Sequence, residues 1–210
     1  PPLAQFVSEI KNAHQSGRNV AVHCVTRAEL MLFLTALEEA GAKPGDRIEH
    51  AAIVDEFMLE WMRRLDVTIV TQPNFITERG EAYAKDVPQR DHANLWRLKS
   101  LMDAGLKVAA GSDAPFGDAN PWTGMASAVN RSFGLVDIEG LTPEAALELD
   151  TKPASGAGTP PRRIEVGEAA DLCLLDQPWK YARQNIAGVN VRATWIDGQL
   201  VYEAVDKPPL

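Results

Sequence analysis

Three side chains that could bind a metal ion each follow, or end, a short run of residues typical of a β-strand. They are His23, His50 and Asp113. Two imidazoles and a carboxylate suit zinc or a similar divalent ion, and a carboxylate beside such an ion can also accept a proton from water. Because ligands of parallel α/β folds bind at the carboxyl ends of strands, these residues predict a metal-dependent catalytic site at that edge of a sheet.

Each of these residues taken alone also has an ordinary structural explanation. A single histidine in an apolar strand is often a hydrogen-bonded core or surface residue. An aspartate before Ala114 and Pro115 could equally form a turn or cap a helix. The occurrence of all three at strand ends favours the metal site. The other two histidines, His14 and His92, lie in polar or helix-terminal positions, where we expect them to face solvent.

Three further residues near the same loops are candidates for binding a substrate. Arg27 and Gln72 could orient a substrate or simply face water, and Gln72 is the stronger candidate of the two. Trp122, which follows an Asn-Pro pair, could form the wall of a pocket or pack in the core. We interpret all three as substrate-binding residues.

The elements that must position these residues alternate between helix and strand. Runs typical of strands occupy residues 20–25, 47–53, 67–71 and 107–111, and helical patterns follow them, including one at 91–105 and one at 123–131. Thr26 and Glu29 have the spacing of a capping box, and Thr142 precedes a proline at the start of another helix. Strands that are apolar on both faces and alternate with helices predict a parallel sheet covered by helices, which is an α/β fold.

The pattern changes towards the carboxyl end of the chain. Residues 152–161 are rich in proline and glycine, which predicts a linker. Beyond it we expect only short strands, at 164–166, 171–175 and 191–202, and the dipeptide Asp197-Gly198 predicts a hairpin within the last of these. We therefore divide the chain into residues 1–160 and a small β-domain at 161–210.

Composition narrows the classes of function. The chain is 45% apolar and 24% charged, as in globular proteins, and its 21 Lys and Arg against 29 Asp and Glu argue against a nucleic-acid partner. No apolar run approaches the roughly 18 residues that would predict a membrane span. Cys24 and Cys173 form no Cys-x-x-Cys motif, which favours a reducing cytoplasm. The chain begins without methionine or a signal-peptide pattern, so we expect that upstream residues have been removed.

Several segments around these residues resemble the amidohydrolase superfamily, in the branch called amidohydrolase family 3. The similarity is carried by residues 47–51, 70–75, 103–105, 111–115 and 121–122, and it continues through 142–147 and 164–172. It covers practically the whole chain, but only the second half of the family pattern.

The resemblance implies a barrel of eight strands in which His23 lies on the fifth strand, His50 on the sixth and Asp113 on the eighth. A (β/α)8 barrel needs about 250 residues. The first four strands, including the family's His-x-His pair, have no counterpart here, because the histidines are at positions 14, 23, 50 and 92. The chain therefore resembles the C-terminal half of a (β/α)8 TIM-type barrel, strands five to eight, with part of a small β-sandwich domain.

The resemblance also implies an activity. In the family, one or two metal ions activate water, and the aspartate of the eighth strand accepts its proton and later protonates the leaving nitrogen. His23, His50 and Asp113 would be metal ligands, with Asp113 also catalytic, and zinc is the expected metal. The substrate would be a small amide or cyclic amide whose C–N bond is hydrolysed.

The absence of the first half has consequences for the isolated chain. With the first-strand ligands missing, we expect weak metal binding and no activity from the chain alone. An open half barrel also exposes strand edges, so we expect it to need the missing N-terminal half or a second copy of the chain. The alternative is a non-enzymatic binding or assembly module built on a relic half barrel. A metal-independent α/β hydrolase lacks support, because no Gly-x-Ser-x-Gly elbow occurs.

Overall fold

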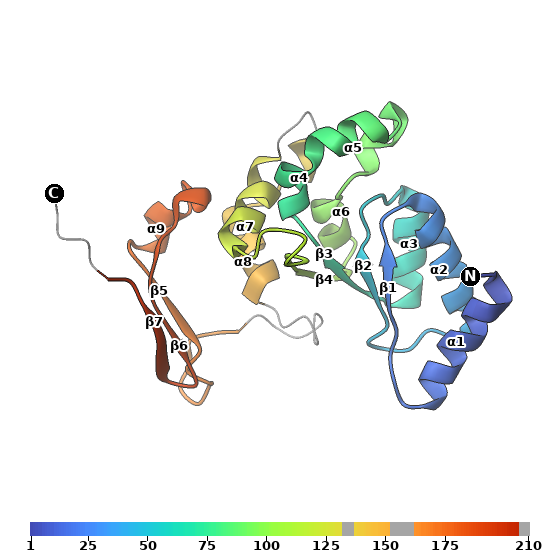
Figure 1. Ribbon diagram of the computed structural model, residues 1–210, viewed down its shortest axis with the longest axis horizontal. Helices are drawn as coiled ribbons and strands as arrows, with labels where there is room; N and C mark the ends of the chain where they lie inside the picture. Colours follow the sequence, from blue (N-terminus) through green and yellow to red (C-terminus); the bar gives the residue numbers. More distant parts are fainter. Residues whose placement is uncertain (132–136, 152–161, 206–210) are drawn as a thin grey trace. The chain divides into compact units, whose positions relative to one another are not determined.

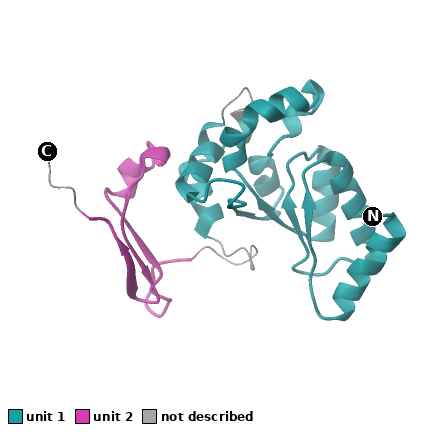
Figure 2. Ribbon diagram, in the orientation of Figure 1, with its two compact units in different colours: residues 1–161 teal, residues 162–210 magenta. Residues whose placement is uncertain are grey.

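The computed structural model describes residues 1–131, 137–151 and 162–205 (Figure 1). The chain divides into two compact units, residues 1–161 and residues 162–210 (Figure 2). The predicted linker at 152–161 lies outside the described residues. No helix in the described ranges is both long enough and apolar enough to cross a membrane.

Unit 1 contains a four-stranded parallel sheet in the order β1-β2-β3-β4. Its strands are β1 (Ala21–Cys24), β2 (Arg47–His50), β3 (Thr68–Thr71) and β4 (Lys107–Ala110). The first residues of neighbouring strands are in register, so all four carboxyl ends lie at one edge of the sheet, which we call the carboxyl edge. The predicted α/β class with a parallel sheet is confirmed.

Helices connect and flank these strands. They are α1 (Leu3–Gln15), α2 (Arg27–Ala40), α3 (Glu56–Leu65), α4 (Asn74–Glu78), α5 (Gly80–Asp86), α6 (Leu98–Asp103), α7 (Pro121–Asn130) and α8 (Pro143–Thr151), with 3-10 turns η1 (Gln89–Asn94) and η2 (Asp137–Glu139). The predicted capping box opens α2, since Thr26 and Glu29 each accept a hydrogen bond from the other's backbone N–H. Thr142 caps α8 through the N–H of Ala145.

The core lies between the sheet and its helices. Ile48, Ile69 and Val108 are neighbours across β2, β3 and β4, and all three are fully buried. On β1, however, Ala21 and His23 are exposed, and on β2 Arg47 and Glu49 are half-buried. The prediction that all strands are apolar on both faces was therefore wrong for these two strands, because their alternate residues are polar or reach solvent.

Two predicted elements are shorter than expected. The helix predicted at 91–105 is divided into η1 and α6, because Trp96 between them adopts a left-handed backbone with φ of 42°. The buried Arg131 stabilises this break by donating to the carbonyl oxygens of Leu95 (3.0 Å) and Trp96 (2.7 Å). The strand predicted at 47–53 ends at His50, whose φ is 75°.

The expectation that His14 and His92 face solvent was wrong. His14 is only 7% exposed, and its Nε2 lies 3.0 Å from Oδ1 of the fully buried Asp46. His92 is half-buried, with Nε2 2.9 Å from the carbonyl oxygen of Val87. Asp46 is brought to His14 by the tertiary fold from 32 positions along the chain, whereas Val87 is a local partner five residues before His92.

Unit 2 contains a three-stranded antiparallel sheet in the order β5-β6-β7. The strands are β5 (Leu172–Leu175), β6 (Val191–Ile196) and β7 (Gln199–Glu203), with α9 (Trp179–Ala182) and a 3-10 turn η4 (Ile186–Gly188) between the first two. The predicted hairpin at Asp197-Gly198 is confirmed, and both residues have positive φ, as a tight two-residue turn requires. The strand predicted at 164–166 does not form, because its residues are exposed and pair with no strand of the described chain.

Candidate metal centre at the carboxyl edge of the sheet

His23 and His50 meet at the carboxyl edge. Their ring centroids are 4.4 Å apart and the rings are nearly perpendicular. In the β1–β2 register His50 is opposite Cys24, so regular alternation would direct His50 to the same face as Cys24 and away from His23. The left-handed backbone at His50 (φ 75°) breaks this alternation and allows the two imidazoles to touch.

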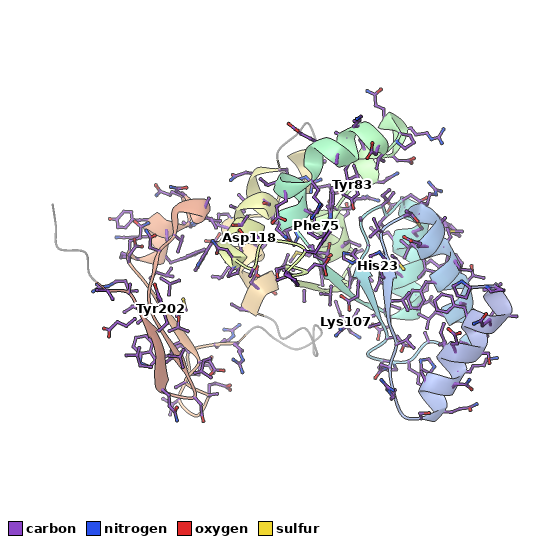
Figure 3. All side chains as sticks on the ribbon, in the orientation of Figure 1. His23, Phe75, Tyr83, Lys107, Asp118 and Tyr202 are labelled. Atoms are coloured by element: carbon purple, nitrogen blue, oxygen red, sulfur yellow. The ribbon has the colours of Figure 1, made fainter. Side chains whose placement is uncertain are left out.

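His50 is enclosed. It is 6% exposed, and its ring stacks on Phe75 with centroids 6.2 Å apart. Figure 3 shows His23 and Phe75 towards one end of the sheet and Lys107, which begins β4, towards the other. Burial lowers the pKa of His50, as does the neighbouring His23, while Asp113 acts in the opposite direction. His50 is therefore neutral at neutral pH, the form that binds a metal ion.

Asp113 follows β4 on an exposed loop, where its backbone is left-handed (φ 55°). Its carbonyl oxygen accepts hydrogen bonds from the N–H groups of Phe116 (2.9 Å) and Gly117 (3.1 Å). Nδ2 of Asn74 donates to the carbonyl oxygen of Ser112 (3.1 Å), which ties this loop to the start of α4. A Cβ at Gly117 would lie 2.2 Å from that same oxygen, so the close approach of the two loops requires glycine.

Arg27 is exposed, and its guanidinium also connects loops. Its guanidinium pairs with Asp55 (2.5 Å) and lies 4.0 Å from a carboxylate oxygen of Asp91. Asp55 in turn caps α3 by accepting from the N–H of Met58 (2.8 Å). Arg27 therefore links the loops that follow β1, β2 and β3.

The other two substrate-binding candidates lie in different surroundings. Gln72 is 3% exposed and lies next to His50, where it influences the pKa of the imidazole. Trp122 is half-buried in the first turn of α7, and its backbone N–H donates to Oδ1 of Asn120 (3.1 Å). The contacts of the described residues thus join Gln72 to His50, but join neither Arg27 nor Trp122 to the histidine pair.

The fit of a metal ion to these residues is partial. In residues 1–131, 137–151 and 162–205, no group of three or more His, Cys, Asp or Glu side chains is arranged to hold a metal ion. His23 and His50 are nevertheless in contact, and Nδ1 of the buried His50 has no hydrogen-bond partner among the residues that the structure describes. Cys24 contributes nothing to such a site, because burial raises the pKa of its thiol to about 12. The described chain offers two adjacent imidazoles of a zinc shell that normally has four ligands.

A separate pocket of about 180 Å³ adjoins the end of β4. It is lined by residues of the β4 end and the starts of α4 and α7, together with Asp150, whereas none of His23, His50 and Asp113 lines it. Desolvation by the surrounding protein raises the pKa of the Asp150 carboxyl group to about 7.

Sequence reasoning missed Phe75 and Gly117 as residues that shape the centre. Phe75 stacks on His50, Asn74 joins two loops, and Gly117 allows their approach. The position of Asn74, three residues after the end of β3, was a usable signal for a loop contact. Nothing local indicated the other two.

A family model described as "Amidohydrolase family" matches residues 5–202. The chain belongs to this family. The resemblance inferred from the sequence is confirmed, and the amidohydrolase match extends over the parallel sheet and the small antiparallel sheet alike.

Individual relatives agree with this assignment. The chain is 30% identical over 204 residues to an N-substituted formamide deformylase of Arthrobacter pascens, covering 91% of this chain and 38% of the relative. It is 27% identical over 207 residues to the putative amidohydrolase YtcJ of Bacillus subtilis (strain 168), covering 92% of this chain and 39% of the relative. The chain thus spans less than half the length of the curated relatives it matches.

Solved structures agree as well. An uncharacterized metal-dependent hydrolase from Pyrococcus furiosus is 32% identical with a TM-score of 0.66, covering 73% of this chain and 32% of that one. An adenosine deaminase from Xanthomonas campestris with bound zinc has a TM-score of 0.70 at 16% identity, covering 98% of this chain and 51% of that one, which shows a shared fold.

Proposed function

We propose that this chain supplies part of the metal centre and barrel of a metal-dependent amidohydrolase that cleaves a C–N bond in a small non-peptide amide or cyclic amide. The observation that carries the proposal is the contact of His23 and His50, 4.4 Å between ring centroids, at the carboxyl edge of a parallel sheet. The charge of Asp113 reaches His50 from the end of β4. Membership of the amidohydrolase family supports this chemistry.

Each residue has a distinct role in the proposed reaction. His23 and His50 would hold a divalent ion, most simply zinc, with Asp113 as a further ligand. The ion, when bound, polarises the amide carbonyl and lowers the pKa of water. Asp113 is exposed on a loop that is anchored at both ends, so its carboxylate can accept a proton from water and return it to the leaving nitrogen. Arg27 and Trp122 remain proposed substrate contacts at the rim.

Zinc titration of the metal-free chain tests the proposed metal centre. With two imidazoles in contact and no assembled three-ligand group, we expect weak binding, lost in both His23→Ala and His50→Ala. His92→Ala is the matched control, because His92 bonds to the carbonyl oxygen of Val87 instead. Calorimetry that gives sub-nanomolar affinity, or equal affinity in all three variants, would contradict the assignment.

We also propose that unit 1 is half of a (β/α)8 barrel and unit 2 part of the family's small β-sandwich domain. Strands β1 and β4 form the two outer edges of the sheet and offer unpaired backbone groups to further strands. Those strands would come from the N-terminal half of the barrel or from a second copy of this chain. Light scattering on the 210-residue chain tests this, because a stable, cooperatively unfolding monomer would show that the sheet is self-sufficient.

A non-enzymatic assembly module is the second candidate, favoured by the incomplete ligand set in the described chain. Assays of the protein in its full natural length, loaded with zinc, against N-substituted formamides and cyclic amides separate the two functions. We expect turnover that Asp113→Asn removes. Zinc binding without turnover of any amide would favour the assembly module.

The two free cysteines, Cys24 and Cys173, support our placement of the protein in a reducing cytoplasm.

A further inference from the structure

Two complementary polar atoms are buried without partners among the described residues at the carboxyl edge, where the Gln72 side chain lies against His50. They are Nδ1 of His50 and Oε1 of Gln72, neither of which has a hydrogen bond of normal geometry within the described residues. His50 is 6% and Gln72 3% exposed, so neither atom is compensated by bulk water. Leaving a buried polar atom unpaired destabilises the folded state. A hydrogen bond between the two atoms would satisfy both of them.

The surroundings of Gln72 determine which end of its amide faces the imidazole. Nε2 of Gln72 lies 3.4 Å from the carbonyl oxygen of Val70, on its own strand. On the same side is Gly111, where a Cβ would come within 3.7 Å of Nε2 and 3.3 Å of Cγ1 of Val70. The amide nitrogen is thus held towards β3 and β4, which leaves Oε1 for His50.

An amide oxygen only accepts hydrogen bonds, so its partner nitrogen must carry a proton. In a neutral imidazole with Nδ1 protonated, Nε2 keeps a free lone pair. Neutral His50 therefore has a preferred tautomer if Gln72 is its partner.

We propose that Gln72 is a positioning residue for His50: its Oε1 accepts a hydrogen bond from Nδ1–H and thereby keeps Nε2 unprotonated and available to a ligand. This role replaces the substrate contact expected from the sequence, since a side chain that is 3% exposed offers almost no surface to a substrate. The identity of the ligand rests on the proposed function, whereas the tautomer does not.

The test is the imidazole nitrogen spectrum of the metal-free protein, recorded by two-dimensional ¹⁵N NMR at a pH where His50 is neutral. We expect Nδ1–H in the native protein and in Gln72→Glu, which keeps an acceptor at the same reach. Gln72→Met, which has similar size and no such acceptor, should give a mixture of tautomers. His92 is the internal control: its Nε2 lies 2.9 Å from a carbonyl oxygen, so it should stay Nε2–H in every variant.

Two outcomes would overturn the proposal: Nε2–H on His50 in the native protein, or Nδ1–H that persists undiminished in Gln72→Met. The native spectrum alone decides the first outcome, even if the methionine variant does not fold. Zinc affinity gives a second readout, with an expected loss of about 10–100-fold in Gln72→Met and little change in Gln72→Glu. If the native protein binds no zinc, the proposed metal function fails while the tautomer result still stands.

Discussion

One histidine is buried near the amino ends of the parallel strands, which we call the amino edge, and another at the carboxyl edge. The two differ in the hydrogen bonds of their rings. At the amino edge, Nε2 of His14 lies 3.0 Å from Oδ1 of Asp46, and Asp46 also accepts from the N–H groups of Val20 (3.0 Å) and Lys43 (2.7 Å). At the carboxyl edge, Nδ1 of His50 has no partner in the described chain. The amino edge is therefore a completed network that stabilises the fold.

The unpaired atoms at the carboxyl edge extend beyond His50. Oγ1 of Thr71, Oε1 of Gln72 and Oδ1 of Asn74 are also buried there without partners in the described residues. Proteins satisfy nearly all buried polar atoms, and exceptions concentrate where a ligand or a catalytic step needs them. Burial of a histidine therefore does not by itself separate the two cases, whereas the hydrogen bonds of the ring distinguish His14 from His50.

The largest effect that would test this contrast is on catalysis. In the protein at full natural length, Asp113→Asn should lower kcat by about 10²–10⁴-fold, because the amide cannot accept the proton from water. Its unfolding free energy should change by less than about 0.5 kcal/mol, since the carboxylate is exposed. Asp118→Asn in the same loop is the control, because both Asp118 carboxylate oxygens serve only the local turn. Equal losses in both variants would point to loop damage instead.

A substitution at the amino edge should lower the stability of the fold. Asp46→Asn should reduce the unfolding free energy by about 3 kcal/mol, because it breaks the buried pair with His14 and replaces an acceptor with a donor. Urea denaturation measures this loss. The control is Asp66→Asn, whose exposed ion pair with Lys107 should be worth less than about 1 kcal/mol. Equal losses of unfolding free energy in the two variants would show that the amino-edge network stabilises the fold no more than an exposed ion pair does.

The close contact at Gly117, which holds the loop that carries Asp113, should have a smaller effect on the unfolding free energy. Gly117→Ala should cost about 1–3 kcal/mol, because a Cβ would lie 2.2 Å from the carbonyl oxygen of Ser112 and 2.4 Å from Nδ2 of Asn74. Gly124→Ala is the control, since the nearest atom to its Cβ would be 3.9 Å away and the residue lies within α7. Thermal denaturation that shows no difference between the two would refute the close contact.

The smallest expected effect concerns the start of α2, at the same carboxyl edge, which is closed by a capping box. Thr26→Ala should cost about 1 kcal/mol by removing the cap. The backbone N–H of Thr26 lowers the pKa of Glu29 below 4.5, so Glu29 stabilises the fold above that pH, and this stability is lost as the pH falls through the lowered pKa. Glu29→Gln should flatten the acid limb of stability against pH. If the loss of stability at acidic pH is unchanged in Glu29→Gln, the capping box does not contribute to the pH dependence of stability.

Much of the fold was predictable because its signals are local. The alternation of apolar runs predicted the strands and most helices, Thr26 and Glu29 predicted a cap, and Asp197-Gly198 predicted a hairpin. Each depends on contacts within a few residues, which the order of side chains determines directly. The placement of His23 and Asp113 near strand ends belongs to the same class.

Other features were decided only by the tertiary structure. The left-handed backbone at His50, which turns its ring towards His23, is held by packing that no local pattern encodes. Asp46 reaches His14 from 32 positions along the chain, and Gln72 is buried beside His50. The sequence by itself determined which residues could do chemistry and which elements carry them. Their pairing depends on contacts between distant segments, so only the folded sheet decided that His14 is paired with Asp46 while Nδ1 of His50 has no such carboxylate partner among the described residues.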